Sequence, residues 1–166
     1  ANELTMPARN IIKSIQDIMR KDAGVDGDAQ RLSQLCWMLF LKIICSQEEQ
    51  IKRINPRKTL IIPEELQWKT WATNGALTGE ELLTFINNEL FPKLKNLSAP
   101  SSGKKRAEVI VDVFEDARNY MKDGTLIRQA INKIDEINFE SLVERKNLGD
   151  IYEQMLNDLQ AAGNSG

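Results

Sequence analysis

Pairs of adjacent carboxylates are the residues of this chain that could most directly support acid–base chemistry. They occur at Glu48–Glu49, Glu64–Glu65, Glu80–Glu81 and Glu115–Asp116. Neighbouring side chains on a helix point about 100° apart, so the two members of a pair do not converge on one substrate atom. The sequence contains no His, which excludes a Ser–His–Asp triad, an imidazole acid–base catalyst and a His metal site. The residue types therefore predict a binding or structural module rather than a self-sufficient enzyme.

The two cysteines, Cys36 and Cys45, lie nine residues apart in one predicted helix. A helix rises 1.5 Å per residue, so the two residues would be about 13 Å apart, too far for a disulfide. Two thiols also cannot form a four-cysteine zinc site. Free thiols and the lack of a recognisable signal peptide predict a cytoplasmic protein. The longest apolar stretch, 35–41, is too short to span a bilayer, which predicts no membrane association.

Basic residues form clusters that could contact the phosphates of nucleic acid. The clusters are Lys52–Arg53 with Arg57–Lys58, Lys93 with Lys95, Lys104–Lys105–Arg106, and Arg145–Lys146. The net charge of the 166 residues is −2, so any DNA contact must come from such local patches or from partner proteins. Acidic residues interleave with the clusters along the chain, which predicts no strong affinity for free DNA, and most charge clusters are solvated surface. The candidate DNA-contacting residues are Lys104, Lys105, Arg106, Arg53, Arg57 and Lys58.

Helical periodicity is nearly continuous and predicts an all-α domain of six to eight helices with mostly short connections. The length suits a single domain, and we expect residues 1–166 to form one. The predicted helix 28–53 is apolar on every side at its centre, which favours a central core helix over a segment covered by another subunit. The segment 60–62 is the one possible minor strand.

Local signals predict several element boundaries. Thr78 with Glu81, and Ser141 with Glu144, have the spacing of capping boxes at helix N-termini. Pro92 is expected to kink or end the helix that follows Thr78.

The second half of the chain contains further signals of this kind. The apolar spacing over 110–121 predicts a helix that stops at 123–124, with Thr125 capping the next one. Asn147 is expected to cap the last helix. In the irregular region before Thr78, Trp68 and Trp71 could form an exposed stacking platform, but buried core is the favoured interpretation.

Three stretches of the sequence resemble one family in the same order along the chain. The first runs from Asp28–Leu32 into Phe40–Ile44, the second from Val113–Asp116 through Tyr120–Gly124, and the third from Asn147–Glu153 to Ala162–Gly166. Together they are similar to the N-terminal helical domain of the modification (methyltransferase) subunit of type I restriction–modification systems. The resemblance covers essentially the whole chain.

The resemblance implies the activity of a longer parent protein. In that family the helical domain precedes a Rossmann-like catalytic domain, which would follow Gly166. The parent subunit is expected to use S-adenosylmethionine to methylate adenine N6 in DNA. The family's aromatic-Thr-Pro, glycine-rich and Asn-Pro-Pro-aromatic motifs would lie beyond Gly166, so no catalytic, cofactor-binding or metal-binding residue is assigned to this chain. We expect these 166 residues to be inactive by themselves.

The resemblance also implies partners. Two modification subunits join one specificity subunit, and a restriction subunit can be added. The helical domain would help close this assembly around double-stranded DNA and contact the other subunits. Enclosure suits adenine methylation, because the target base must leave the duplex to be modified. The alternative is a stand-alone helical protein–protein interaction module with no nucleic-acid role, and a small enzyme based on paired carboxylates is the least favoured interpretation.

Overall fold

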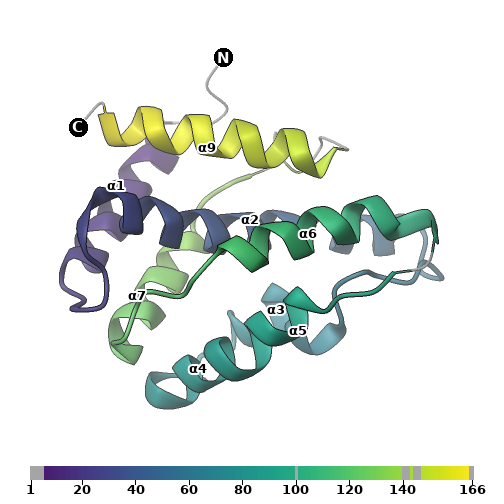
Figure 1. Ribbon diagram of the computed structural model, residues 1–166, viewed down its shortest axis with the longest axis horizontal. Helices are drawn as coiled ribbons and strands as arrows, with labels where there is room; N and C mark the ends of the chain where they lie inside the picture. Colours follow the sequence, from purple (N-terminus) through teal and green to yellow (C-terminus); the bar gives the residue numbers. More distant parts are fainter. Residues whose placement is uncertain (1–5, 100, 140–142, 144–146, 165–166) are drawn as a thin grey trace.

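The computed structural model describes residues 6–99, 101–139, 143 and 147–164 of the chain. These residues form an all-α domain, as predicted (Figure 1). The α-helices are α1 (Met6–Arg20), α2 (Gly27–Ile54), α3 (Trp68–Trp71), α4 (Gly79–Phe85), α5 (Phe91–Lys95), α6 (Lys104–Asp116), α7 (Gly124–Ile134) and α9 (Leu148–Asn164). The predicted capping box at Ser141–Glu144 and the basic pair Arg145–Lys146 lie outside the described residues, apart from Val143.

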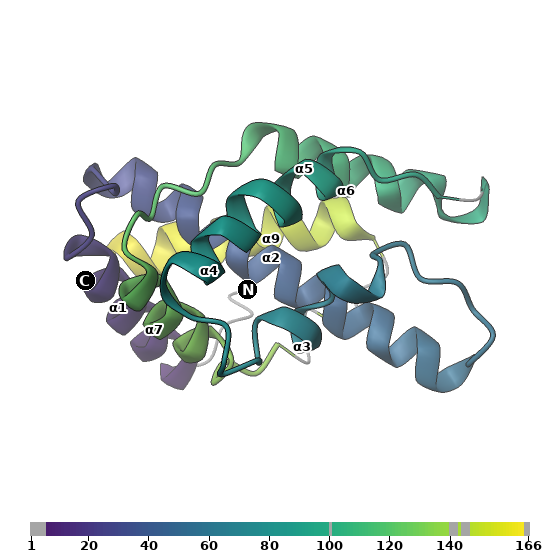
Figure 2. The ribbon, with the colours of Figure 1, turned by 90° about the horizontal axis from the view of Figure 1, so that it is seen from below.

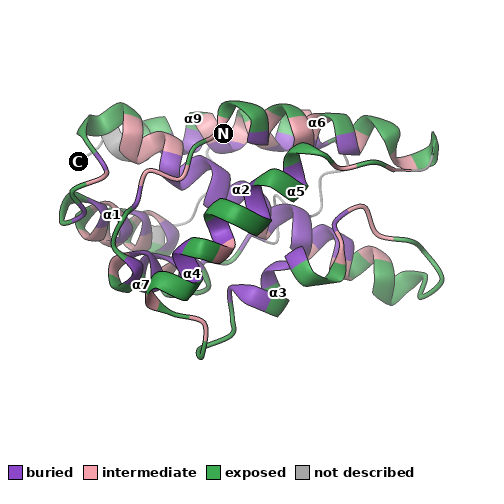
Figure 3. Ribbon diagram, turned by 60° about the horizontal axis from the view of Figure 1, so that its bottom comes forward, coloured by how far each residue is buried: buried purple, intermediate pink, exposed green. Residues whose placement is uncertain are grey.

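Helix α2 is the central element of the fold. Its 28 residues span about 42 Å. The other helices surround it: α9 lies along one side, α3 lies on the opposite side, and α7 packs near its middle (Figures 1 and 2). The apolar centre predicted for this helix is buried all round, and Trp37 and Phe40 are among the largest fully buried side chains (Figure 3). The prediction of a central core helix is confirmed.

The segment 60–62 does not form the predicted strand. It is irregular, and no strand occurs anywhere in the described part of the chain. The backbone N–H groups of Ile61 and Ile62 donate instead to the buried carboxylate of Glu48, each at 2.8 Å. These donors therefore find their acceptor on a helix side chain, which the local apolar pattern of the segment cannot reveal.

Helix α6 ends five residues earlier than the apolar spacing predicts. It stops at Asp116, and residues 117–123 run as an extended connection to α7. The buried carboxylate of Asp22 explains this path, because it accepts hydrogen bonds from the backbone N–H groups of Lys122 and Asp123 at 3.0–3.1 Å. Asp123, rather than the predicted Thr125, then caps α7 by accepting from the N–H groups of Thr125 and Leu126.

The helix that begins after Thr78 continues through Pro92 by widening its turn. Helix α4 passes into a π-helical segment, Ile86–Leu90, which passes into α5. Proline lacks an N–H and its ring would clash with the carbonyl four residues earlier in an α-helix, and a wider turn relieves this clash. The predicted start of α4 is correct, but the Thr78 side chain makes no capping hydrogen bond.

Gly124 and Gly79 bring the starts of α7 and α4 into backbone contact. A Cβ atom on Gly124 would overlap the backbone of Gly79, which itself has a φ of +58°. A positive φ suits glycine, and so does so close an approach of two backbones. The contact fixes α4 against α7 and thereby places α4 beside the extended segment 117–123.

Candidate nucleic-acid interface

Two stretches of the chain contain basic residues and no acidic ones. They are residues 51–63 and 91–107. Together they hold nine of the 22 Lys and Arg residues, so the rest of the chain has 13 basic and 24 acidic residues, a charge of −11. The acidic residues that interleave with the basic clusters along the chain therefore lie outside these two stretches. The net charge of the whole chain is close to zero, but the charges are distributed very unevenly along it.

The fold brings the two stretches together at one end of the molecule. A Cβ atom on Gly103 would lie 3.3 Å from the Ile61 side chain, so the loop after α2 touches the turn before α6. Figures 1 and 2 show the end of α2 and the start of α6 at the same end of the domain. We call this region the basic end. Its exposed cations are Lys52, Arg53, Arg57, Lys58, Lys104 and Lys105, and the second stretch carries two further exposed lysines, Lys93 and Lys95, on α5.

The loop of the basic end is held by buried polar groups. Glu48 is only 2% exposed, and its carboxylate accepts from Gln67 Nε2 at 3.2 Å in addition to the two backbone N–H groups of the loop. Gln67 Nε2 also donates to the Ile62 carbonyl at 2.9 Å. Lys52 Nζ donates to the Lys58 carbonyl at 3.0 Å across the turn. The backbone that carries Arg57 and Lys58 is therefore fixed by bonds to α2.

The candidate residues differ in what their charges do. Arg53 pairs with Glu49 at 3.3 Å on the surface of α2, an exposed pair that contributes little to stability. Arg57 and Lys58 have no ion pair with any described residue, and neither do Lys104 and Lys105. Four of the six candidates therefore present unpaired positive charges to solvent.

Arg106 differs from its neighbours because its guanidinium turns inward. Nη1 donates to Gln47 Oε1 at 3.1 Å, and Gln47 Nε2 donates to the Val143 carbonyl at 3.0 Å. Burial lowers the pKa of the Arg106 guanidinium below its usual range, and the negative charge of Glu48 opposes this effect. Arg106 thus anchors the start of α6 to α2 and positions Lys104 and Lys105 at the surface.

The charges at both ends of α6 oppose its dipole. Its first turn contains three cations and no acid, and its last residues, Glu115 and Asp116, are acidic with no base in the last turn. Each such charge typically costs about 0.3–1 kcal/mol on an exposed helix. The arrangement does not stabilise α6, so the helix dipole gives no reason for the exposed charges of Lys104 and Lys105.

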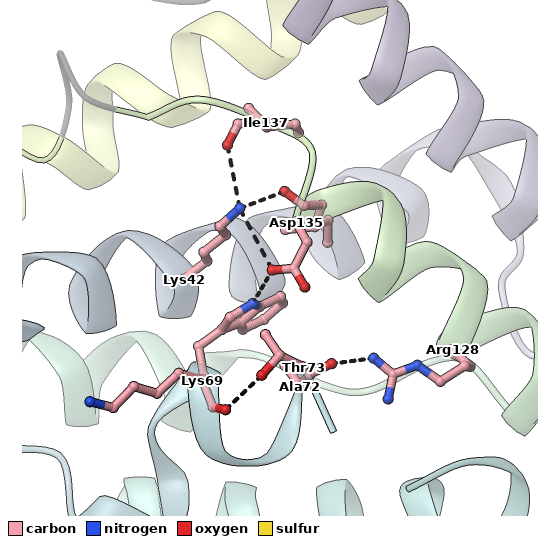
Figure 4. Close-up of polar contacts among 9 residues, drawn as sticks. Lys42, Lys69, Ala72, Thr73, Arg128, Asp135 and Ile137 are labelled. Atoms are coloured by element: carbon pink, nitrogen blue, oxygen red, sulfur yellow. Dashed lines mark hydrogen bonds and ion pairs between the residues drawn. The ribbon is translucent and has the colours of Figure 1, made fainter. Parts of the chain in front are cut away.

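A second polar network, which the sequence did not reveal, joins α2, α3 and α7 (Figure 4). Trp68 Nε1 donates to Asp135 at 2.6 Å, and Lys42 Nζ donates to the carbonyls of Ile134 and Ile137 at 2.9 and 3.3 Å. Burial lowers the pKa of Lys42, and the charge of Asp135 opposes this effect. The available signal was a lysine inside an otherwise apolar helical stretch, which indicates a paired buried charge.

Arg128, also on α7, holds the loop between α3 and α4 through a separate set of hydrogen bonds. It is 8% exposed and donates to the carbonyls of Ala72, Asn74 and Leu77. Trp68 and Trp71 are 4% and 3% exposed, which confirms the prediction that both belong to the core. These contacts hold residues 68–77 against the helical body.

The described residues offer no constellation for catalysis. None of their Cys, Asp and Glu side chains gather in a group of three that could hold a metal ion. Among the buried carboxylates, Asp22 and Glu48 accept from backbone N–H groups, and Asp158 accepts from Gln154 Nε2 at 3.0 Å. Burial raises the pKa of both thiols, Cys36 and Cys45, to about 12, which keeps them protonated and unreactive at neutral pH. No helix in the described ranges is long and apolar enough to cross a membrane.

Comparison with known proteins identifies the family. Residues 8–134 match the family described as the HsdM N-terminal domain. The chain is 56% identical over 162 residues to the type I restriction enzyme EcoEI methylase subunit of Escherichia coli, an alignment that covers 97% of this chain and 33% of that protein. The chain therefore spans about a third of the length of this relative.

Two solved structures share the fold. A modification subunit of a putative type I restriction enzyme from Vibrio vulnificus YJ016 superposes with a TM-score of 0.77 and 36% identity, over 98% of this chain and 38% of that one. The second structure is a chain from a study of complex assembly and conformational transition of the type I R-M system. It superposes with a TM-score of 0.68 and 30% sequence identity, over 93% of this chain and 31% of that one. The chain thus belongs to the HsdM N-terminal domain family of type I restriction–modification methylase subunits.

Proposed function

We propose that this domain is the non-catalytic N-terminal part of a DNA adenine-N6 methyltransferase subunit and helps its complex to enclose double-stranded DNA. The observation that carries the proposal is the basic end, where two acid-free stretches combine in a domain whose other residues have a charge of −11. Phosphate contacts of this kind position a protein on DNA without reading its sequence. In this proposal the specificity subunit supplies the base readout.

The remaining parts of the proposal concern the parent protein. A catalytic domain after Gly166 would bind S-adenosylmethionine and carry out methyl transfer in the cytoplasm. The chain itself contains no glycine-rich phosphate- or nucleotide-binding motif, so none of its residues is assigned to the cofactor. The partners of the domain would be the specificity subunit, the second modification subunit and, in the larger assembly, the restriction subunit. The similarity to a chain studied for complex assembly supports subunit contacts.

The test removes the exposed charges of the basic end in the full-length subunit within its assembled complex. Two double variants are Lys104→Ala with Lys105→Ala, and Arg57→Ala with Lys58→Ala. The matched control is Lys13→Ala with Lys21→Ala, which removes two exposed lysines from the region of α1. The slope of log K against log salt for DNA binding should become shallower by about 0.9 for each phosphate that the variant no longer neutralises, and only in the basic-end variants. Equal slopes in all three variants would favour the alternative of a protein–protein module without a nucleic-acid role.

A further inference from the structure

A polar groove lies between the α4–α5 helix and the extended segment 117–123, away from the basic end. Its volume is about 460 Å³, within the range of ligand pockets in proteins. The polar side chains that line it are Glu80, Thr84, Asn87, Asn88, Asn119 and Lys122. Thr84 lies four residues after Glu80, and Asn87 and Asn88 lie three and four residues after Thr84. At these spacings the four side chains share one face of the helix.

A chain of side-chain amides fixes one wall of this groove. Gln34, which is fully buried in α2, accepts from the Tyr120 N–H at 2.7 Å through Oε1. Gln34 Nε2 then donates to Asn119 Oδ1 at 2.9 Å. Asn119 Nδ2 donates in turn to Asn87 Oδ1 at 3.0 Å. A carboxamide accepts through its oxygen and donates through its nitrogen. The buried amide of Gln34 therefore sets the orientation of the Asn119 amide, which in turn sets that of Asn87.

Asn87 consequently presents a fixed donor to the groove. Its Oδ1 is occupied, and its Nδ2 has no hydrogen-bond partner among the described residues. The π-helical turn Ile86–Leu90 adds Asn88 beside it, and both side chains are exposed. The groove therefore combines a preset donor with further adaptable amide and hydroxyl groups.

The charges of the groove favour a neutral occupant. Glu80 and Lys122 contribute one charge of each sign, and the other polar groups are carboxamides and a hydroxyl. A nucleic-acid backbone requires several cations, which this protein places at the basic end instead. An extended polypeptide presents one N–H donor and one C=O acceptor per residue and no backbone charge, which matches the lining.

We propose that this groove binds an extended polypeptide segment of the specificity subunit through hydrogen bonds from its amides to the backbone of that segment. The inference rests on the proposed function, because it assigns a place on this domain to the subunit contacts. The proposal places the two contacts on different parts of the domain. DNA phosphates bind at the basic end, and the partner polypeptide binds in the polar groove.

The test is Asn87→Asp in the full-length subunit, mixed with its purified specificity subunit in the absence of DNA. Aspartate still accepts from Asn119 Nδ2, so the fold is kept, but it cannot donate into the groove and would face the partner's carbonyl with a negative charge. The half-maximal concentration for complex assembly should rise about tenfold or more. The matched control is Asn132→Asp, since Asn132 is also exposed and accepts from Arg128 Nε at 3.2 Å.

A second variant, Asn88→Ala, guards against a folding defect, because Asn88 makes no hydrogen bond through its side chain within the described structure. Weaker assembly in either groove variant, with Asn132→Asp unchanged and normal thermal unfolding, supports the proposal. Unchanged assembly in both groove variants overturns it. Normal assembly with weaker DNA binding also overturns it, since the groove would then face DNA. Failure of the proposed DNA role appears separately, as an unchanged salt dependence of the basic-end variants.

Discussion

Replacing Glu48 with glutamine tests whether a single buried carboxylate organises the loop of the basic end. In the wild-type chain one carboxylate oxygen accepts from the Ile62 N–H and from Gln67 Nε2, and the other accepts from the Ile61 N–H. Glutamine offers one acceptor oxygen, so its amide nitrogen would face one backbone N–H, donor against donor. Glu48→Gln therefore removes at least one hydrogen bond and leaves a backbone donor without a partner.

The expected loss of stability follows from these bonds. A hydrogen bond to a charged group contributes about 1.5–3 kcal/mol, and the bonds that remain become neutral ones of about 1 kcal/mol. Relief of the buried charge offsets part of the loss. We expect the free energy of unfolding to fall by about 2–4 kcal/mol, which lowers Tm by roughly 5–15 °C for a chain of this size.

Urea unfolding followed by tryptophan fluorescence measures this loss, and hydrogen exchange at the Ile61 and Ile62 amides shows whether it arises in the loop. Glu49→Gln is the matched control, because the Glu49 side chain is 43% exposed and, among the described residues, forms an ion pair only with Arg53 on the surface. This control should change stability by less than about 0.5 kcal/mol. The reasoning is wrong if the two variants unfold at the same urea concentration and the two amides stay equally protected.

Three further predictions concern other buried groups. Arg106→Ala should lower the free energy of unfolding by about 1–3 kcal/mol, whereas Lys104→Ala and Lys105→Ala should each change it by less than about 0.5 kcal/mol in the same urea assay; equal effects would contradict the inward orientation of Arg106. Asp22→Asn should speed hydrogen exchange at the Lys122 and Asp123 amides and destabilise the domain by about 2–3 kcal/mol, and unchanged exchange would refute its role. Unfolded thiols ionise near pH 8.5, whereas burial raises the pKa of Cys36 and Cys45 to about 12, so the unfolded state binds fewer protons between these values. Stability should consequently decline as pH rises above about 9, and the double variant Cys36→Ala with Cys45→Ala should show a smaller decline; parallel profiles would count against it.

Features encoded by local pattern could be predicted from the sequence. The all-round apolar centre of α2 predicted a buried helix, and the structure confirms it. The start of α4 after Thr78 and the capping of α9 by Asn147, whose Oδ1 accepts from the Asp150 N–H at 3.2 Å, follow from short-range signals. Such signals depend only on residues within one turn of each other.

Features set by distant partners could not be predicted in this way. The early end of α6 depends on Asp22, which lies about 100 residues away from the N–H groups that it binds. The apolar segment 60–62 lacks strand pairing because Glu48 satisfies its backbone. The inward turn of Arg106 depends on Gln47. The sequence grouped Arg106 with Lys104 and Lys105, and only the fold separates an anchor from exposed charges.

The predicted DNA-contacting residues divide in the same manner. The sequence showed that these residues cluster along the chain. It did not show that residues 51–63 lie beside residues 91–107, which follows from the contact between Ile61 and Gly103 in the fold. The polar groove was not foreseen, because its lining residues come from two separate segments, 80–88 and 119–122, and carry no charge pattern. DNA contact by the six candidate residues stays a proposal that the salt-dependence measurement addresses.

The packing of α1 on α7 also determines how the domain can form during synthesis. About 110 residues separate the end of α1 from the end of α7, its main neighbour (Figure 1). At 5–20 residues per second, α1 leaves the ribosome roughly 6–20 s before that neighbour is complete. The apolar face of α1, with Ile12, Ile15 and Met19 fully buried in the finished fold, has no such cover during this interval. Nascent chains of this domain are therefore expected to depend on chaperone binding near α1 until α7 emerges.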